Sequence, residues 1–438
     1  MTRPHSSHTE SHLYFKRHVL PWIMFSIAVS FYGYAYFLRV SLSTMKPELM
    51  EHFHMTAAQF GHLAAFYYYV YTPMQIPVGV LIDKYGVRTS LVMACLTCAL
   101  GVSVFISAEH SYTVACIGRF LMGFGSAFAY ISVLKISSLW LPTRHFALAA
   151  GLTTAFAMVS AIISDFYLAK WVHVIGYNDT LYYAIVMGII LASVIFLFLR
   201  SRPRPEHAHR PPAYRSSFPE LFAGLRVIFS RPQTYYIGAI GFLLYLPASV
   251  FMDLWGIPYF QDAYHLSPEQ AAHMMMMPFI GWIIGSPMAG YISDKIGLRR
   301  PPLLIASIAA LFISLVIFYV PDLSHSMMTI LLLLLGFFCG AHPLVFSLIR
   351  ENNSNKLSGT STATTNFMIM LGGVIFQPIV GVLLNWHWQS HATLTNGLQS
   401  YSAADYHFAL SIIPIGLALA IVFTLLTKET YCHLPEDY

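Results

Sequence analysis

The same ten-residue pattern occurs twice in the chain, at positions 79–88 and 290–299, which lie 211 residues apart. The copies read GVLIDKYGVR and GYISDKIGLR, so both follow G-x-x-x-D-K-x-G-x-R. Each copy lies between two apolar segments that are long enough to cross a lipid bilayer. A repeat at matching places in so hydrophobic a chain indicates a protein built from two similar halves.

Composition places the chain in a membrane. Of its 438 residues, 57% are hydrophobic and 10% are charged, whereas a soluble domain carries about 25% charged residues. Twelve apolar runs approach or exceed the length of a transmembrane helix. They fall near 18–45, 57–82, 88–107, 112–134, 145–170, 179–199, 234–255, 270–292, 301–320, 326–349, 359–384 and 403–427. We therefore expect an all-α membrane protein with 12 transmembrane helices in two pseudo-symmetric six-helix bundles.

A polar break separates the first six runs from the last six. Between positions 200 and 231 it holds seven arginines, two glutamates and several prolines, with an amphipathic stretch near 218–229. The expected units are an N-terminal tail at 1–17, a bundle at 18–199, a linker at 200–233, a bundle at 234–427 and a tail at 428–438. We expect the linker and both tails to lie in the cytoplasm.

The basic residues support this orientation. With both termini in the cytoplasm, 20 of the 24 lysines and arginines lie in or beside cytoplasmic segments. Lys46 and Lys170 fall on the outer side, and Arg39 and Arg119 fall inside predicted helices. Because cytoplasmic loops carry the excess of Lys and Arg, the opposite orientation would reverse the observed bias.

The repeated pattern resembles the signature loop of the major facilitator superfamily, which follows the second helix and is echoed after the eighth. The resemblance covers nearly the whole chain. It implies the fold of that family and a monomeric transporter that works by alternating access in the bacterial inner membrane. In the family this loop acts as a conformational latch. The residues that match it here are Gly79, Asp83, Lys84, Gly86, Arg88, Gly290, Asp294, Lys295, Gly297 and Arg299.

We expect pairs of opposite charges to hold the latch. Asp83 and Asp294 lie at cytoplasmic helix ends, and the basic residues after them are placed to pair with an acid or a helix carboxyl end. The glycines are expected to let the next helix approach closely. An ordinary topogenic role is the alternative for Lys84, Lys295 and Arg300.

An arginine inside a bilayer costs at least ~2.5–3.5 kcal/mol, so Arg39 requires an explanation. It lies in the stretch YFLRVSLS, which resembles the Y-x-x-R-V-N-L-S stretch of the anion–cation symporter branch. There the arginine faces the cavity and meets a substrate carboxylate or phosphate, which a guanidinium matches bidentately. The alternative is an arginine that reaches the outer headgroups.

Four further intramembrane groups are candidates for ion coupling. Arg119 begins RFLMGFG, which is similar to the R-x-x-x-G-x-G element linked in the family to proton coupling or substrate charge. A structural ion pair with Asp165 is its alternative. Asp165, Asp253 and His342 are candidate proton carriers. Sugar-acid carriers of the anion branch have acids where this chain has Leu38 and Ser126, so sodium coupling and facilitated transport stay open.

Polar and aromatic side chains in the predicted helices are candidates for the wall of a solute cavity. The tyrosines at 67, 68, 69 and 71 cover several faces of one helix, so some must face lipid or the interface. The expected binding residues are Arg39, Tyr36, Tyr67, Tyr71, Gln75, Arg119, Trp255, Tyr259, Asn366 and Gln377.

These features predict a transporter of a small solute that bears a carboxylate. The stretch 74–79, Arg350-Glu351-Asn352, Gly359 and Asn366 resemble a gammaproteobacterial branch that includes phagosomal amino-acid transporters. A polycarboxylate-siderophore carrier, an efflux pump and a non-transporting receptor remain alternatives. The expected partners are the solute, a proton or sodium ion and the lipid bilayer, without nucleic acid, metal or cofactor. No nucleophile–base arrangement, phosphate loop or metal-spaced His/Cys set points to an enzyme.

Overall fold

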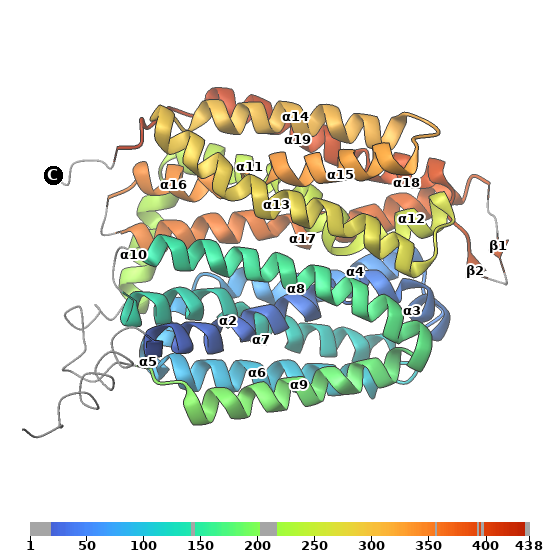
Figure 1. Ribbon diagram of the computed structural model, residues 1–438, viewed down its shortest axis with the longest axis horizontal. Helices are drawn as coiled ribbons and strands as arrows, with labels where there is room; N and C mark the ends of the chain where they lie inside the picture. Colours follow the sequence, from blue (N-terminus) through green and yellow to red (C-terminus); the bar gives the residue numbers. More distant parts are fainter. Residues whose placement is uncertain are drawn as a thin grey trace, which may run out of the picture.

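The computed structural model describes residues 19–141, 145–201, 217–354, 357–391, 394–395 and 398–433. These residues fold almost entirely into helices, which run along the long axis of the molecule (Figure 1). The N-terminal helices are α2 (Leu20–Val40), η2 (Ser43–Met45), α3 (Lys46–His52), α4 (Ala57–Met74), α5 (Val78–Tyr85), α6 (Val87–Ile106), α7 (Tyr112–Trp140), α8 (Phe146–Ile175) and α9 (Tyr177–Phe198).

The second half begins after the amphipathic helix α10 (Phe218–Phe229), which has the bounds expected for the amphipathic stretch. Its helices are α11 (Pro232–Leu244), η5 (Pro247–Trp255), α12 (Gly256–Tyr264), α13 (Pro268–Ile296), α14 (Arg300–Tyr319), α15 (His325–Cys339), α16 (Leu344–Glu351), α17 (Ser358–Trp388), α18 (Ala403–Leu410) and α19 (Ile412–Leu426). A short antiparallel pair, β1 (Leu394–Thr395) and β2 (Leu398–Gln399), lies between α17 and α18.

The two halves occupy opposite sides of the molecule. In Figure 1 helices α2 to α9 fill the lower part and α11 to α19 the upper part, with α17, α8 and α4 near the boundary. One end of the molecule carries α5, α10 and α16, and we call it the α10 end. The opposite end carries α3, α12 and α18, and we call it the α18 end. The arrangement agrees with two helical bundles, while their exact bounds stay a prediction.

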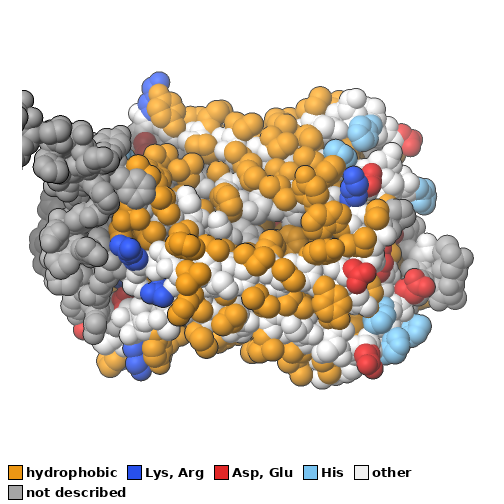
Figure 2. All heavy atoms as spheres, turned by 60° about the horizontal axis from the view of Figure 1, so that its bottom comes forward, with side chains coloured by type: hydrophobic (Ala, Val, Ile, Leu, Met, Phe, Trp, Pro, Cys, Tyr) orange, Lys and Arg blue, Asp and Glu red, His pale blue; other side chains and the backbone are white. Residues whose placement is uncertain are grey.

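The outer surface is apolar between these two ends. Figure 2 shows a broad hydrophobic zone, with most basic side chains of the visible face at the α10 end and most acidic and histidine side chains at the α18 end. Large apolar side chains of α9 such as Tyr183, Ile190 and Leu197 are more than half exposed. Such a zone suits the hydrocarbon interior of a bilayer.

Eleven of the described helical segments are long and apolar enough to cross a membrane. The segment expected at 57–82, which forms α4 and α5, is not among these eleven. Its helix α4 carries Gln59, His62 and several tyrosines, and it packs against α17 of the other half rather than against lipid alone. Gln59 and His62 are exposed, whereas Tyr67, Tyr68 and Tyr71 of this helix are buried.

Proline and turn residues shape the ends and breaks of the helices. Helix α4 stops just after Pro73, and a π-helical segment starts at Pro247, because proline removes a backbone donor from the helix. Helices α13 and α17 continue through Pro278 and Pro378 without interruption. Among the described helices, four begin with capping boxes, at Thr56, Ser217, Ser267 and Ser402.

Candidate functional site

An arginine ringed by tyrosines lies at the interface between the two halves. The Cζ atom of Arg39 lies 4.9 Å from the ring centroid of Tyr36, 5.8 Å from that of Tyr67, 5.4 Å from that of Tyr68 and 4.8 Å from that of Tyr71. Arg39 is 5% exposed. Cation–π attraction stabilises a guanidinium in such a cage but does not neutralise its charge.

The periodicity of two helices builds this cage. Tyr36 and Arg39 are three residues apart on α2, and Tyr67 and Tyr71 are four residues apart on α4, so each pair shares one helix face. The rings of Tyr67 and Tyr71 stack with their centroids 5.6 Å apart. Tyr69 lies outside the cage and hydrogen-bonds His62 instead.

An aspartate of the other half closes the cage. Asp253 lies on η5, is 1% exposed, and accepts hydrogen bonds from Tyr68 at 2.7 Å and from Tyr36 at 3.4 Å. The two tyrosines thus contact both Arg39 and Asp253. Arg39 forms no ion pair with a described carboxylate, and its Nε atom is buried without a hydrogen-bond partner. We call Tyr36, Arg39, Tyr67, Tyr68, Tyr71 and Asp253 the central cluster.

Arg119 supports the central cluster from α7. Its guanidinium donates to the carbonyl oxygens of Leu38 at 2.7 Å and Arg39 at 3.4 Å, and lies 5.1 Å from the ring centroid of Tyr67. It therefore binds the last carbonyls of α2, which have no partner within that helix. The alternative of an ion pair with Asp165 is wrong, because the carbonyl oxygens of α2 hold this guanidinium.

The other candidate coupling groups lie apart from Arg39. Asp165 on α8 accepts a hydrogen bond from Ser43 at 3.3 Å, and its second oxygen is buried without a partner. His342 lies in the break between α15 and α16, where its ring packs against Tyr245 and Trp282 and both ring nitrogens lack a partner. Neither group contacts Arg39 directly, so their coupling roles stay predictions.

The remaining binding candidates are the polar residues Gln75, Asn366 and Gln377 and the aromatic residues Trp255 and Tyr259. Gln75 accepts a hydrogen bond from Asn366 at 2.8 Å, and this contact joins the two halves. Gln377 donates to the carbonyl of Ser249 at 2.7 Å, and its side-chain oxygen is buried without a partner. Trp255 and Tyr259 are fully buried, and they occupy different surroundings.

The indole of Trp255 packs against Phe60 of the other half and donates to the carbonyl of Gln377. Tyr259 lies among the aromatic rings of the second half, including Phe251, Phe318 and Tyr406. The structure therefore places Trp255 at the interface between the halves and Tyr259 away from the central cluster.

A second set of contacts joins the halves at the α18 end. The Nζ atom of Lys46 lies 2.5 Å from Asp262 and 2.8 Å from the hydroxyl of Tyr406, which itself donates to Asp262 at 2.6 Å. The backbone nitrogen of Ala57 donates to Tyr401 at 3.2 Å. These contacts hold the two halves together at this end. Sequence reasoning missed them, because Lys46 and Asp262 lie 216 positions apart.

The two copies of the repeated loop form different ion pairs. In the first half, Asp83 pairs with Lys135 of α7 at 2.6 Å, while the Arg88 guanidinium lies over the ring of Phe196. Both contacts stay within one half. The loop thus ties neighbouring helices of the first half to each other.

In the second half, Arg299 pairs with Asp294 at 2.6 Å and with Glu351 of α16 at 2.8 Å. Burial disfavours the charged guanidinium, but the hydrogen bonds that it donates to Glu351 and Asp294 prevail and raise the pKa of Arg299. Arg300 donates to the carbonyls of Thr424 and Leu425 at the end of α19. These contacts match the expected pairing of basic loop residues with an acid and with a helix carboxyl end.

The expected role of the loop glycines needs correction. No atom would lie within 4 Å of a Cβ added at Gly79 or Gly290, so close helix approach does not explain these two residues. Gly86 and Gly297 instead have φ angles of 84° and 69°. Because side chains disfavour this left-handed region, the turn conformation requires glycine at these two positions.

The two acids that pair with Arg299 should contribute very differently to the free energy of unfolding. Glu351 is buried and Asp294 is largely exposed. We expect Glu351→Ala to lower the free energy of unfolding by about 3 kcal/mol, because it leaves a buried cation short of a partner. Asp294→Ala should cost no more than about 1 kcal/mol. Thermal denaturation in detergent checks both variants, and equal losses would contradict the buried pairing.

Comparison with known proteins agrees with this architecture. The chain matches the sequence profile of the Major Facilitator Superfamily over residues 23–377. It belongs to this superfamily. A solved bacterial homologue of the human lysosomal transporter Spinster, in an inward-facing and occupied conformation, shares the fold with a TM-score of 0.71 and 14% identity, over 92% of this chain and 96% of that chain.

Curated relatives in the superfamily include carriers and a sensor. The probable sulfoacetate transporter SauU of Cupriavidus necator is 22% identical, over 81% of this chain and 85% of its own length. The probable L-galactonate transporter of Escherichia coli is 26% identical over 79% of each chain. The membrane sensor protein UhpC of Escherichia coli is 24% identical, over 86% of this chain and 88% of its own length.

Proposed function

We propose that this protein is a secondary transporter that binds a small organic anion at Arg39 and moves it across the membrane by alternating access. The observation that carries the proposal is a buried guanidinium that lies between the two halves and forms no ion pair with any carboxylate among the described residues. An unpaired charge inside a membrane protein is costly and marks a functional site by default. An anionic solute would supply the missing partner.

The chemistry of Arg39 favours a carboxylate. A guanidinium offers a planar fork that pairs bidentately with a carboxylate, and four tyrosine rings exclude other partners from its faces. Sulfoacetate and L-galactonate, the solutes in the names of two relatives, both bear a carboxylate. Amino acids, as the resemblance to the phagosomal branch suggests, and polycarboxylate siderophores belong to the same chemical class.

The cycle we propose uses the contacts between the halves. The solute reaches Arg39 from the α18 end when the Lys46–Asp262 contact is broken. It reaches Arg39 from the α10 end when that contact is formed. Protonation of Asp253, or of Asp165 or His342, would couple transport to a proton gradient, with Arg119 holding the end of α2 in place. Sodium coupling remains the alternative.

The surface charge supports an orientation for this cycle. Basic side chains gather at the α10 end (Figure 2), so we propose that this end faces the cytoplasm of a bacterial cell, with both termini on that side and the α18 end outside. The Lys46–Asp262 contact then closes the outer end of a monomeric carrier in the inner membrane.

Uptake by proteoliposomes tests the proposal. The purified chain would be offered labelled sulfoacetate, L-galactonate, citrate, amino acids and a sugar phosphate, each with and without an inward proton gradient. We expect at least one carboxylate solute to enter, and a gradient to increase its accumulation if protons are coupled. Folded protein that takes up none of these carboxylates would overturn the proposal.

A non-transporting receptor is the second candidate, because UhpC is named as a membrane sensor and aligns over most of both chains. The ion pairs in both repeated loops argue for a protein that still changes conformation. A solute that raises the denaturation temperature of the protein but never enters the vesicles would favour the receptor.

A further inference from the structure

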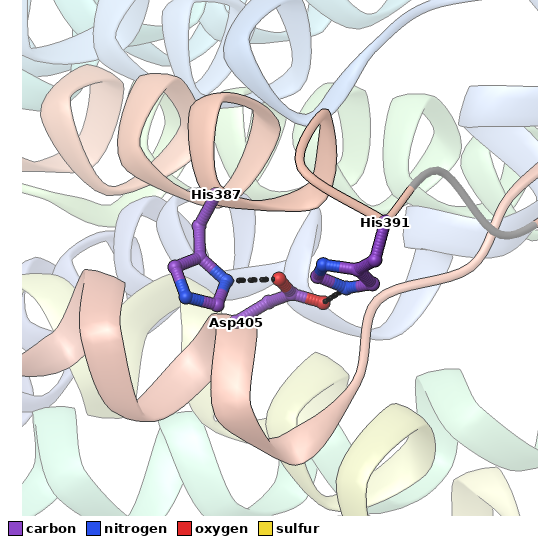
Figure 3. Close-up of side chains that lie close together, drawn as sticks. All are labelled: His387, His391 and Asp405. Carbon is purple, nitrogen blue, oxygen red and sulfur yellow. Dashed lines mark hydrogen bonds and ion pairs between the residues drawn. The ribbon is translucent and has the colours of Figure 1, made fainter.

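Two histidines and an aspartate come together at the α18 end (Figure 3). The Nδ1 atom of His387 lies 2.6 Å from one carboxylate oxygen of Asp405, and the Nε2 atom of His391 lies 3.2 Å from the other. One ligand atom from each of the three residues lies within 4.8 Å of the other two. The cluster is separate from Arg39 and from the contacts used in the proposed transport cycle.

Local structure explains how these residues meet. His387 lies in the last turn of α17, His391 lies in the turn that follows Trp388, and both side chains point toward Asp405 (Figure 3). Asp405 is the third residue of α18 and belongs to a capping box with Ser402. The backbone nitrogen and the hydroxyl of Ser402 donate to Asp405 Oδ2 at 2.7 Å and 2.8 Å, which fixes the orientation of the carboxylate.

We propose that His387, His391 and Asp405 bind a divalent transition-metal ion of the zinc class. Two imidazoles and one carboxylate are ligands that zinc prefers, and two histidines separated by three residues have the spacing of many zinc sites. Ligand atoms around tetrahedral zinc lie about 3.4 Å apart, so small side-chain rotations suffice. Metal binding requires the two ligating imidazole nitrogens to be unprotonated, so the protons that link them to the carboxylate move to the other ring nitrogens or to solvent.

One of the three ligands is buried and the other two are partly exposed, as expected for a metal site that exchanges its ion with solvent. The Asp405 side chain is 0% exposed, whereas those of His387 and His391 are 33% and 37% exposed. A metal ion can therefore enter from solvent, and water can complete its coordination. The expectation that the chain has no metal-spaced histidines overlooked this pair, because the third ligand follows only after a further 14 positions.

A metal bound at this cluster would also affect the structure around it. Asp405 precedes Tyr406, whose hydroxyl contacts both Lys46 and Asp262. A metal bound to His387, His391 and Asp405 links the end of α17 to the start of α18, beside the contacts that join the halves. It would restrain this end of the second half whether or not the protein transports a solute.

Zinc binding to the full chain, purified without a histidine tag, tests the site. Equilibrium dialysis against Zn²⁺ alone should show one site that is lost or weakened at least ~10-fold in His387→Ala and in His391→Ala. His325→Ala, which removes an exposed histidine at the same end of the molecule, should bind as the parent does. The parent and all variants keep the histidines at 5, 8 and 12, so zinc bound by that tail is the same in each.

A second readout separates lost ligands from lost folding. Zn²⁺ should raise the denaturation temperature of the parent and of His325→Ala but not that of either cluster variant, measured on samples whose metal-free denaturation temperatures agree. His387→Gln and His391→Gln, which keep polar side chains without an imidazole, serve where the alanine variants do not fold. Equal zinc affinity in the parent and the cluster variants would overturn the site. So would a parent that binds no Zn²⁺, and neither result bears on transport.

Discussion

Arg39→Ala is expected to abolish the binding of carboxylate solutes while the protein remains folded. The guanidinium is the positive charge that the tyrosine cage surrounds, and truncating one member of a buried charge pair typically costs ~2–5 kcal/mol. This corresponds to a loss of at least about 30-fold in affinity. A thermal-shift screen of the anions used for uptake should stabilise the parent and leave the variant unchanged.

Two further variants make this result specific. Arg39→Lys keeps the positive charge but loses the planar fork, so it should bind the same solutes more weakly than the parent and more tightly than Arg39→Ala. Arg226→Ala removes an exposed arginine of α10 and should leave binding unchanged. If the anions stabilise Arg39→Ala as much as the parent, Arg39 is not part of the binding site.

Hydropathy and the cost of intramembrane charge predicted the outline of this molecule. Apolar runs gave the positions of the helices, and the amphipathic stretch of the linker forms α10 with the expected bounds. Arg39 and Arg119 stood out because a bilayer penalises an unpaired charge. Both lie buried near the interface between the halves, where a membrane protein can hold a charge away from lipid.

The partners of these charges could not be read from the sequence. Four tyrosines lie within five positions of α4, and only the packing of α4 against α7 and α17 decides that Tyr69 lies outside the cage. Arg119 is bound by two backbone carbonyls, for which no side-chain pattern exists. The Lys46–Asp262 pair joins residues from different halves, so its formation depends on how the bundles dock.

Close packing of α13 against α15 sets a limit on side-chain size that no charge pattern reveals. A Cβ added at Gly336 would lie 1.8 Å from the carbonyl oxygen of Pro278. On the facing helix, a Cβ at Gly281 or Gly285 would lie 2.0 Å from a carbonyl oxygen of α15. Backbone atoms cannot rotate away as a flexible side chain can, so the two helices would have to separate. Small residues permit such close approach between membrane helices.

We therefore expect Gly336→Ala to destabilise the protein by about 3 kcal/mol or more, because overpacking a tight contact usually costs ~1–3 kcal/mol and here the obstacle is backbone. Gly151→Ala is the matched control. It lies within α8 with no atom within 4 Å of the added Cβ, so the better helix propensity of alanine should stabilise the protein by ~0.5–1 kcal/mol. Denaturation in detergent would measure both variants. The same methyl group should thus have opposite effects at two glycines, and a Gly336→Ala variant as stable as the parent would mean that α13 and α15 do not pack this closely.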